Sequence, residues 1–202
     1  SDWSSDVCSS DLAVIANLKV NKDASTDMRG NDYVDLNTGN DRIVMGANLT
    51  VGDTILGGLN NDVLTYTDSN GANVGDELNN VTGIDTIELG NATTYVVTVN
   101  NLVAANATLT VDGTALSGGN SLFWNGAAEL DGSFNITAAD GHNTLVGGAQ
   151  ADVIVSGNGN DSIVGGEGAN TIYASGGNNT VNAGDGNDII NAGLGNDTIS
   201  AG

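Results

Sequence analysis

The last third of the chain carries one inward-facing apolar position in every nine residues. Divided into nonapeptides from Ala138 onward, the sequence has an aliphatic residue at the eighth position of all seven repeats. In a three-residue strand of β-forming residues, the central side chain points opposite to its two neighbours. The pattern therefore predicts one short strand per repeat, with its central residue in the core. These central residues are Leu145, Ile154, Ile163, Ile172, Val181, Ile190 and Ile199.

The first six residues of each nonapeptide predict a tight turn. Glycine fills position four in six of the seven repeats, with Gln150 as the exception, and Asp or Asn fills position six in all seven. Glycine adopts positive φ without steric cost, and Asn and Asp tolerate it best among the other residues. One nonapeptide then makes half a coil, and two make a coil of 18 residues that stacks in parallel on the next.

A shorter block near the N-terminus has the same arrangement. Asp32, Asp41, Asp53 and Asp62 each stand two residues before an aliphatic residue, at spacings of nine, twelve and nine. One insertion therefore interrupts the phase, and this block is a degenerate version of the C-terminal one.

The middle of the chain alternates apolar and polar residues without the nonapeptide. Strands are predicted at 86–89, 95–99, 108–112, 121–124 and 134–137, and a short helix is predicted at 101–107. Wider coils of one continuous solenoid are the simplest arrangement, and a separate small β-domain is the alternative. Phe123 and Trp124 can fill the core or form a binding surface, and the core is the favoured interpretation.

These patterns predict an all-β fold, a right-handed parallel β-roll or β-solenoid with wider irregular coils in the middle. Residues 1–12 contain the sole cysteine, Cys8, and are interpreted as a non-native, adapter-like segment. The expected divisions are N-terminal coils with degenerate turns at 13–65, wider coils or a small β-domain at 66–137, and a truncated nonapeptide roll at 138–202.

The net charge of the chain excludes some classes of function. The chain has 25 acidic and four basic residues, a net charge of −21. Nucleic-acid binding through phosphate neutralisation is excluded at this charge, and no apolar run approaches the about 18 residues of a membrane-spanning helix. So acidic a chain repels itself when compact, which favours bound cations.

Catalytic motifs are missing, and the chain is not expected to be an enzyme. His142 is the sole histidine, so the zinc motif H-E-x-x-H is absent, as is the G-x-S-x-G motif. His142 is expected to be a solvated turn residue. Outward Thr144, Ser162, Thr180 and Thr198 could form an ice-binding face, but such residues are also ordinary strand surface.

The repeat resembles the RTX, or haemolysin-type, calcium-binding nonapeptide G-G-x-G-x-D-x-U-x. The middle is similar to strand-rich segments of bacterial surface-layer and adhesin-like proteins. The resemblance implies Ca²⁺ between the turns of adjacent coils, held by position-six side chains and backbone carbonyls. The implied side-chain ligands are Asp152, Asp161, Asp188, Asp197, Asn143, Asn170, Asn179, Asp32, Asp41, Asp53 and Asp62. The implied turn glycines are Gly157, Gly159, Gly166, Gly168, Gly184, Gly186, Gly193 and Gly195.

Alternation of Asp and Asn departs from the family pattern. The family arrangement implies that Asp161 pairs with Asn143 and Asn179 on one edge and that Asp152 pairs with Asn170 on the other. Each site then has one carboxylate, which predicts weak affinity, with dissociation constants of about 10⁻⁴–10⁻³ M. The alternative is that ladders of asparagine replace the metal.

The resemblance implies a calcium-binding structural module of a secreted or cell-surface bacterial RTX protein, of the adhesin or surface-layer type. Such a module folds on binding calcium after type I secretion. The alternative is the C-terminal tail of a secreted hydrolase, a protease or lipase, whose catalytic domain is missing. Expected partners are calcium ions, the rest of a longer parent chain, and other copies or a cell surface.

Overall fold

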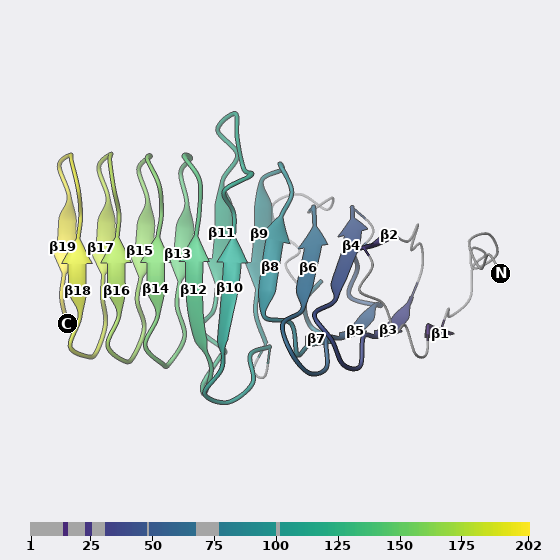
Figure 1. Ribbon diagram of the computed structural model, residues 1–202. Helices are drawn as coiled ribbons and strands as arrows, with labels where there is room; N and C mark the ends of the chain where they lie inside the picture. Colours follow the sequence, from purple (N-terminus) through teal and green to yellow (C-terminus); the bar gives the residue numbers. More distant parts are fainter. Residues whose placement is uncertain (1–13, 16–22, 26–30, 48, 68–76, 100–101) are drawn as a thin grey trace.

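Short parallel strands, connected by turns and loops, make up the described part of the chain. The computed structural model describes residues 14–15, 23–25, 31–47, 49–67, 77–99 and 102–202, and no helix occurs within these ranges. Figure 1 shows the strands stacked in chain order, from β3 (Tyr33–Asp35) to β19 (Thr198–Ser200). This arrangement confirms the predicted all-β parallel solenoid.

Successive strands alternate between two faces of the solenoid, and one face is a single nine-stranded sheet. That sheet contains β2 (Asp23–Ser25), β4 (Arg42–Gly46), β6 (Val63–Tyr66), β8 (Thr86–Leu89), β10 (Thr108–Asp112), β12 (Ser133–Thr137), β14 (Val153–Val155), β16 (Thr171–Tyr173) and β18 (Ile189–Asn191). The other face has a four-stranded sheet of β1 (Val14–Ile15), β3, β5 (Thr54–Leu56) and β7 (Val81–Thr82). A separate six-stranded sheet contains β9 (Thr94–Val97), β11 (Leu122–Asn125), β13 (Thr144–Val146), β15 (Ser162–Val164), β17 (Thr180–Asn182) and β19.

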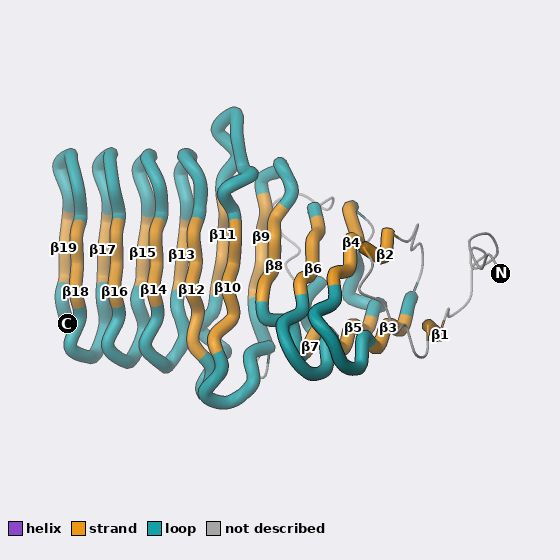
Figure 2. The backbone as a smooth tube through the Cα atoms, in the orientation of Figure 1, coloured by secondary structure: helices purple, strands orange, loops and turns teal. Residues whose placement is uncertain are grey.

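Coil length changes along the chain. In the C-terminal block Thr171 pairs with Ile189, 18 residues further on, whereas in the middle Thr94 pairs with Leu122, 28 residues further on. The additional residues lie in the loops that Figure 2 colours teal. The predicted wider coils are therefore present, and the nine-stranded sheet runs through them without a break.

The predicted strands of the middle segment are close to the observed ones. The strands expected at 86–89 and 108–112 coincide with β8 and β10, and the other three lie within two residues of β9, β11 and β12. The divisions at 13–65, 66–137 and 138–202 remain predictions, and residues 1–12 lie outside the described residues.

The predicted short helix at 101–107 is wrong over its described residues, 102–107, which form a loop. The backbone N–H of Val103 donates to the Oε2 atom of the buried Glu129, at 3.1 Å, rather than to a helical carbonyl. Asn106 has a φ of 62°, whereas residues of an α-helix have a φ of about −63°. Leu102 and Val103 are buried, so their apolar character serves the core instead of a helix face.

The core is a row of aliphatic side chains between the two faces, as predicted. Of the seven position-eight residues, five are buried, whereas Ile190 is half-buried and Ile199 is exposed because β18 and β19 are the last strands of their sheets. Trp124 is buried and meets the ring of Phe134 edge-on, with 5.5 Å between centroids. Phe123 instead lies on the outer face, stacked against Tyr95.

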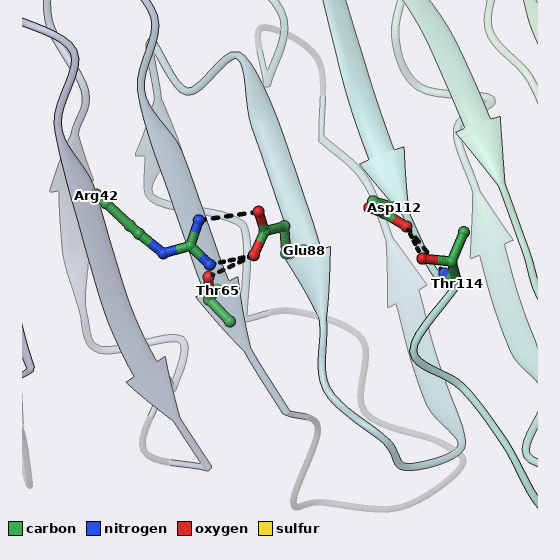
Figure 3. Close-up of polar contacts among 5 residues, drawn as sticks. All are labelled: Arg42, Thr65, Glu88, Asp112 and Thr114. Carbon is green, nitrogen blue, oxygen red and sulfur yellow. Dashed lines mark hydrogen bonds and ion pairs between the residues drawn. The ribbon is translucent and has the colours of Figure 1, made fainter. Parts of the chain in front are cut away.

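An ion pair spans three strands on the outer face of the nine-stranded sheet. Arg42 on β4 reaches across β6 to both carboxylate oxygens of Glu88 on β8, and Thr65 donates to the same carboxylate (Figure 3). Arg42 and Thr65 hold the pKa of Glu88 below its usual value, against the opposing effect of burial. Both charged side chains are about one-third exposed, so the pair contributes little to stability.

No helix in the described residues is long and apolar enough to span a membrane.

Candidate metal centres at the coil corners

The position-six side chains lie at the corners of the solenoid, which are the turns that connect its two faces. Each corner residue directly precedes a strand and points inward, as Asn143 does before β13 and Asp161 before β15. Asp188 and Asp197, in the last coil, are half-buried. The other predicted ligands are buried: Asp32, Asp41, Asp53, Asp62, Asn143, Asp152, Asp161, Asn170 and Asn179.

Hydrogen bonds link the corner residues of successive coils into ladders. The backbone N–H of Asn143 donates to Oδ1 of Asp161 at 2.8 Å, and that of Asp161 donates to Oδ1 of Asn179 at 3.0 Å. The N–H of Asn179 donates in turn to Oδ1 of Asp197 at 2.8 Å. The second edge repeats this ladder through Asp152, Asn170 and Asp188. The residues that the repeat pairs are therefore in direct contact.

The N-terminal corners form ladders made only of carboxylates. The N–H of Asp32 donates to Oδ1 of Asp53 at 2.8 Å, and that of Asp41 donates to Oδ1 of Asp62 at 2.9 Å. The N–H of Asp62 donates to Oδ2 of Asp85 at 2.7 Å. Asp85 is absent from the sequence-based prediction, although it stands two residues before the buried centre of β8, as the other corner residues do.

Among the corners that the structure describes, the second carboxylate oxygen is buried without a hydrogen-bond partner at four. These buried Oδ2 atoms belong to Asp32, Asp41, Asp62 and Asp188. At Asp62 a carbonyl faces the same space: a methyl group added to Gly57 would lie 1.9 Å from the Gly83 oxygen and 3.1 Å from Asp62 Oδ2. A buried acceptor without a donor is costly. Two acceptors that border the same space are an arrangement that a cation satisfies.

The asparagine corners differ because they direct a donor toward the carbonyls. Nδ2 of Asn143 donates to the backbone carbonyl oxygen of Ser156 at 2.7 Å, and Nδ2 of Asn179 donates to the backbone carbonyl oxygen of Ala174 at 3.1 Å. Asn170 does the same toward the carbonyl of Ala183, at 3.2 Å. At these corners the amide supplies the protons that the turn carbonyls need.

Two aspartate corners in the C-terminal block have their second oxygen satisfied by the protein. Oδ2 of Asp161 accepts from the hydroxyl of Ser156 at 2.6 Å, and Oδ2 of Asp152 accepts from the N–H of Gly148 at 2.7 Å. The predicted ligand set therefore divides into corners with a protein donor and corners without one.

The eight predicted turn glycines all lie in the left-handed region, with φ between 78° and 152°. At Gly159 an added methyl group would lie 1.7 Å from the Gly141 oxygen of the preceding coil, so glycine is required for close stacking as well as for its φ. The structure thus gives these glycines a role in coil packing. Their role as carbonyl ligands stays a prediction.

Burial raises the pKa values of four corner carboxylates, Asp32, Asp62, Asp152 and Asp161. Burial raises the pKa of Asp62 to about 6, an effect that the N–H of Asp41 opposes and the charges of Asp41 and Asp85 reinforce. Burial likewise raises the pKa of Asp152 to about 6, although the N–H groups of Phe134 and Gly148 lower it. Burial is also the main cause of the raised pKa values of Asp32 and Asp161.

These raised pKa values predict that the calcium-free protein becomes more stable as the pH falls from 7 to 5. A carboxyl whose pKa is higher in the folded chain contributes stability below its unfolded value, and that contribution is lost as the pH rises through about 6. Glu88, whose pKa is lowered, acts in the opposite sense only at more acidic pH. Thermal melts of protein freed of metal by dialysis would measure the trend, and a melting temperature that falls on acidification would contradict it.

The residues present fit calcium only if backbone carbonyls take part. Within the described ranges no group of three or more His, Cys, Asp and Glu side chains is placed to hold a metal ion. Calcium takes six to eight oxygen ligands and accepts backbone carbonyls. The unpartnered Oδ2 of Asp62 and the nearby Gly83 carbonyl oxygen would supply two of these ligands, and further carbonyl oxygens and water would supply the rest.

His142 has a structural role at the surface. Its Nδ1 atom lies 3.0 Å from the backbone nitrogen of Asn160, whose N–H donates to it. The side chain of Asn160 accepts from Asn178 in the same way, one coil further on. His142 therefore begins an exposed ladder, which agrees with the expected turn role.

Comparison with known families identifies the repeats. A family model described as the RTX calcium-binding nonapeptide repeat, in four copies, matches residues 26–47, 137–172 and 164–199. These segments cover fewer than half of the 202 residues and include most of the predicted corners. Neither the curated proteins nor the solved structures compared with the chain include a match.

Proposed function

We propose that this chain is a structural module of a secreted or cell-surface protein, of the adhesin or surface-layer type. The proposal is based on its RTX calcium-binding nonapeptide repeats, which bind Ca²⁺. Calcium would complete the folding of this module after export. The ligands would be the position-six carboxylates together with turn carbonyls. Bound calcium would supply positive charge between acceptors that otherwise face each other.

The observation that carries this proposal is the set of buried carboxylate oxygens without a donor. A charged oxygen removed from water needs a compensating partner, and the protein provides none to Oδ2 of Asp41 or Asp62. Both side chains are at most 5% exposed. Calcium binding at such corners would convert metal-binding free energy into folding free energy.

Net charge supports a folding step that depends on the environment. At −21 the chain repels itself when compact, and each bound calcium ion would remove two of those charges. In a calcium-poor cytosol the chain would stay loosely folded and fit for export. Outside the cell, calcium would favour the stacked coils. Extended coils with buried side chains suit a scaffold, which supports the structural role.

Calcium should raise the melting temperature by several degrees. At about 5 mM, well above the ~10⁻⁴–10⁻³ M dissociation constants of extracellular modules, each occupied site contributes roughly 1–2 kcal/mol. For a chain of this size each kcal/mol corresponds to about 2–4 °C. Thermal unfolding of the full chain, followed by circular dichroism with and without calcium, measures the effect.

Magnesium at the same concentration is the control, because it prefers small octahedral sites and keeps its water. The titrations should contain moderate salt, so that general screening of the acidic chain is equal in every sample. Equal shifts with calcium and magnesium, or no shift with either, would show that the corners do not select calcium.

A further inference from the structure

We propose that the residue at position six decides how each corner is closed: an asparagine closes it with its own amide and excludes calcium, whereas an aspartate without a protein donor requires the ion. The proposal rests on the calcium-binding function above and names the corners at which it operates. It implies that most of the corners in the C-terminal nonapeptide block do not depend on calcium, although this block has the more regular repeats.

Asn143 shows the amide in the position that a cation would take. Four oxygen atoms surround its Nδ2: the carbonyls of Ala139 at 3.0 Å, Gly141 at 3.4 Å and Ser156 at 2.7 Å, and Oδ1 of Asp161 at 3.3 Å. They come from two successive coils, and three of them are backbone carbonyls of the turns. Such a convergence of oxygens suits calcium, but the amide nitrogen already fills its centre.

The amide cannot turn around to offer its oxygen instead. Oδ1 of Asn143 accepts the backbone N–H of Leu122 at 2.8 Å. A rotation of the amide by half a turn would set its NH₂ group against that N–H, two donors facing each other in a site that is 1% exposed. The ladder therefore fixes which end of the amide faces the carbonyls.

The other two asparagine corners have the same construction. The N–H of Asp152 donates to Oδ1 of Asn170 at 2.9 Å, which leaves Nδ2 directed at the Ala183 oxygen. The N–H of Asp161 donates to Oδ1 of Asn179 at 3.0 Å, which leaves Nδ2 between the carbonyls of Ala174 and Ala192. In each case the amide oxygen accepts the ladder N–H, and the amide nitrogen donates to the surrounding turn oxygens, which we call the cage.

An aspartate in the same ladder has the opposite effect. Asp62 uses Oδ1 to accept the N–H of Asp41, so its second oxygen faces the space beside Gly57, where the Gly83 carbonyl also points. That second oxygen has no donor. At Asp161 the hydroxyl of Ser156 supplies the missing proton, so this corner is also closed without an ion.

The decisive substitution is Asn143→Asp. It would replace the donor in the cage with a second carboxylate oxygen, next to Oδ1 of Asp161 and three carbonyls. We expect the variant to bind one more calcium ion per chain than the wild type. In metal-free buffer it should melt several degrees lower than the wild type, and calcium should reverse most of that loss. Calcium bound per chain is measured by equilibrium dialysis and elemental analysis.

Asn178→Asp is the matched control, because it introduces the same charge one residue away from a corner. Asn178 is exposed, and its Oδ1 accepts the N–H of Asn196, a bond that a carboxylate can keep. This variant should bind the same number of calcium ions as the wild type.

Asp62→Asn tests the rule in reverse and does not depend on whether the first variant folds. The amide would donate toward the cage, so the variant should bind one calcium ion fewer and melt at a higher temperature than the wild type in metal-free buffer. Asp185→Asn, an exposed substitution with the same change in charge, is its control and should change neither quantity.

The outcomes separate this rule from the general function. A wild-type chain that binds no calcium would overturn the proposed function whatever the variants do. A wild-type chain that binds calcium, with no additional ion in folded Asn143→Asp, would overturn the rule alone. A lower metal-free melting temperature for Asp62→Asn than for Asp185→Asn would also overturn it.

Discussion

Replacing Trp124 with alanine should lower the free energy of unfolding by about 3–5 kcal/mol, as expected for an aromatic residue removed from a packed core. Trp124 is fully buried, and its ring meets that of Phe134 edge-on. It pairs with Val96 on one side and Leu145 on the other, so it packs where the wide coils of the middle meet the narrow coils of the C-terminal block. A cavity at this point would weaken the contact between the two.

Denaturant titration at a fixed calcium concentration would measure the loss. Trp124→Phe is the matched control, because it keeps a ring against Phe134 and removes an indole N–H that has no hydrogen-bond partner. We expect this control to cost less than half as much as the alanine variant. A loss below about 1 kcal/mol for Trp124→Ala, the range of a surface substitution, would contradict its place in the core.

Periodicity made the narrow coils predictable from the sequence. An aliphatic residue at position eight of each nonapeptide, such as Ile154, and an Asp or Asn two residues before it are enough to predict the strands, their inward side chains and the contact between corner residues one coil apart. In the N-terminal block the ladder partners Asp41 and Asp62 are 21 residues apart instead of 18, because one of the spacings there is twelve residues rather than nine. Each of these features depends on residues that are close in sequence and recur at a regular spacing, and such features can be predicted from the sequence.

Contacts without such a period were not predictable. Glu129 is fully buried and accepts hydrogen bonds from the N–H groups of Val103, Leu130 and Gly132, and nothing in the local sequence marks it. That contact holds 102–107 as a loop, so the apolar pattern there predicted the wrong element. Loop length in the middle coils follows from such individual contacts rather than from a repeat.

The division between asparagine and aspartate corners also needed the structure. The sequence shows that Asn143 and Asp161 alternate, and it leaves open whether asparagine weakens a calcium site or replaces it. The outcome depends on which end of the amide the ladder N–H of Leu122 engages. Hydrogen bonds between coils determine the orientation of the amide, and this orientation cannot be predicted from the composition or the spacing of the residues.

Replacing Gly159 with alanine should strongly destabilise the corner at which it lies, and we expect a loss of roughly 2–6 kcal/mol. A φ of 140° strains any residue with a side chain, at about 1–3 kcal/mol. The new methyl group would also lie 1.7 Å from the Gly141 oxygen, and such overpacking costs about 1–3 kcal/mol more because the backbone must move. The displaced Gly141 carbonyl belongs to the cage around Asn143 Nδ2, so the damage would reach the corner itself.

Gly118→Ala separates the two causes. Gly118 has a φ of 68°, and an added methyl group there would meet nothing within 4 Å, so only the conformational strain remains. Denaturant titrations of both variants should therefore give a clearly larger loss for Gly159→Ala, together with weaker protection of the corner amides from hydrogen exchange. Equal losses would mean that the coils are not stacked closely enough for the Gly141 carbonyl to exclude a side chain. In that case the corners would be too loose to direct an amide or an ion toward their carbonyls.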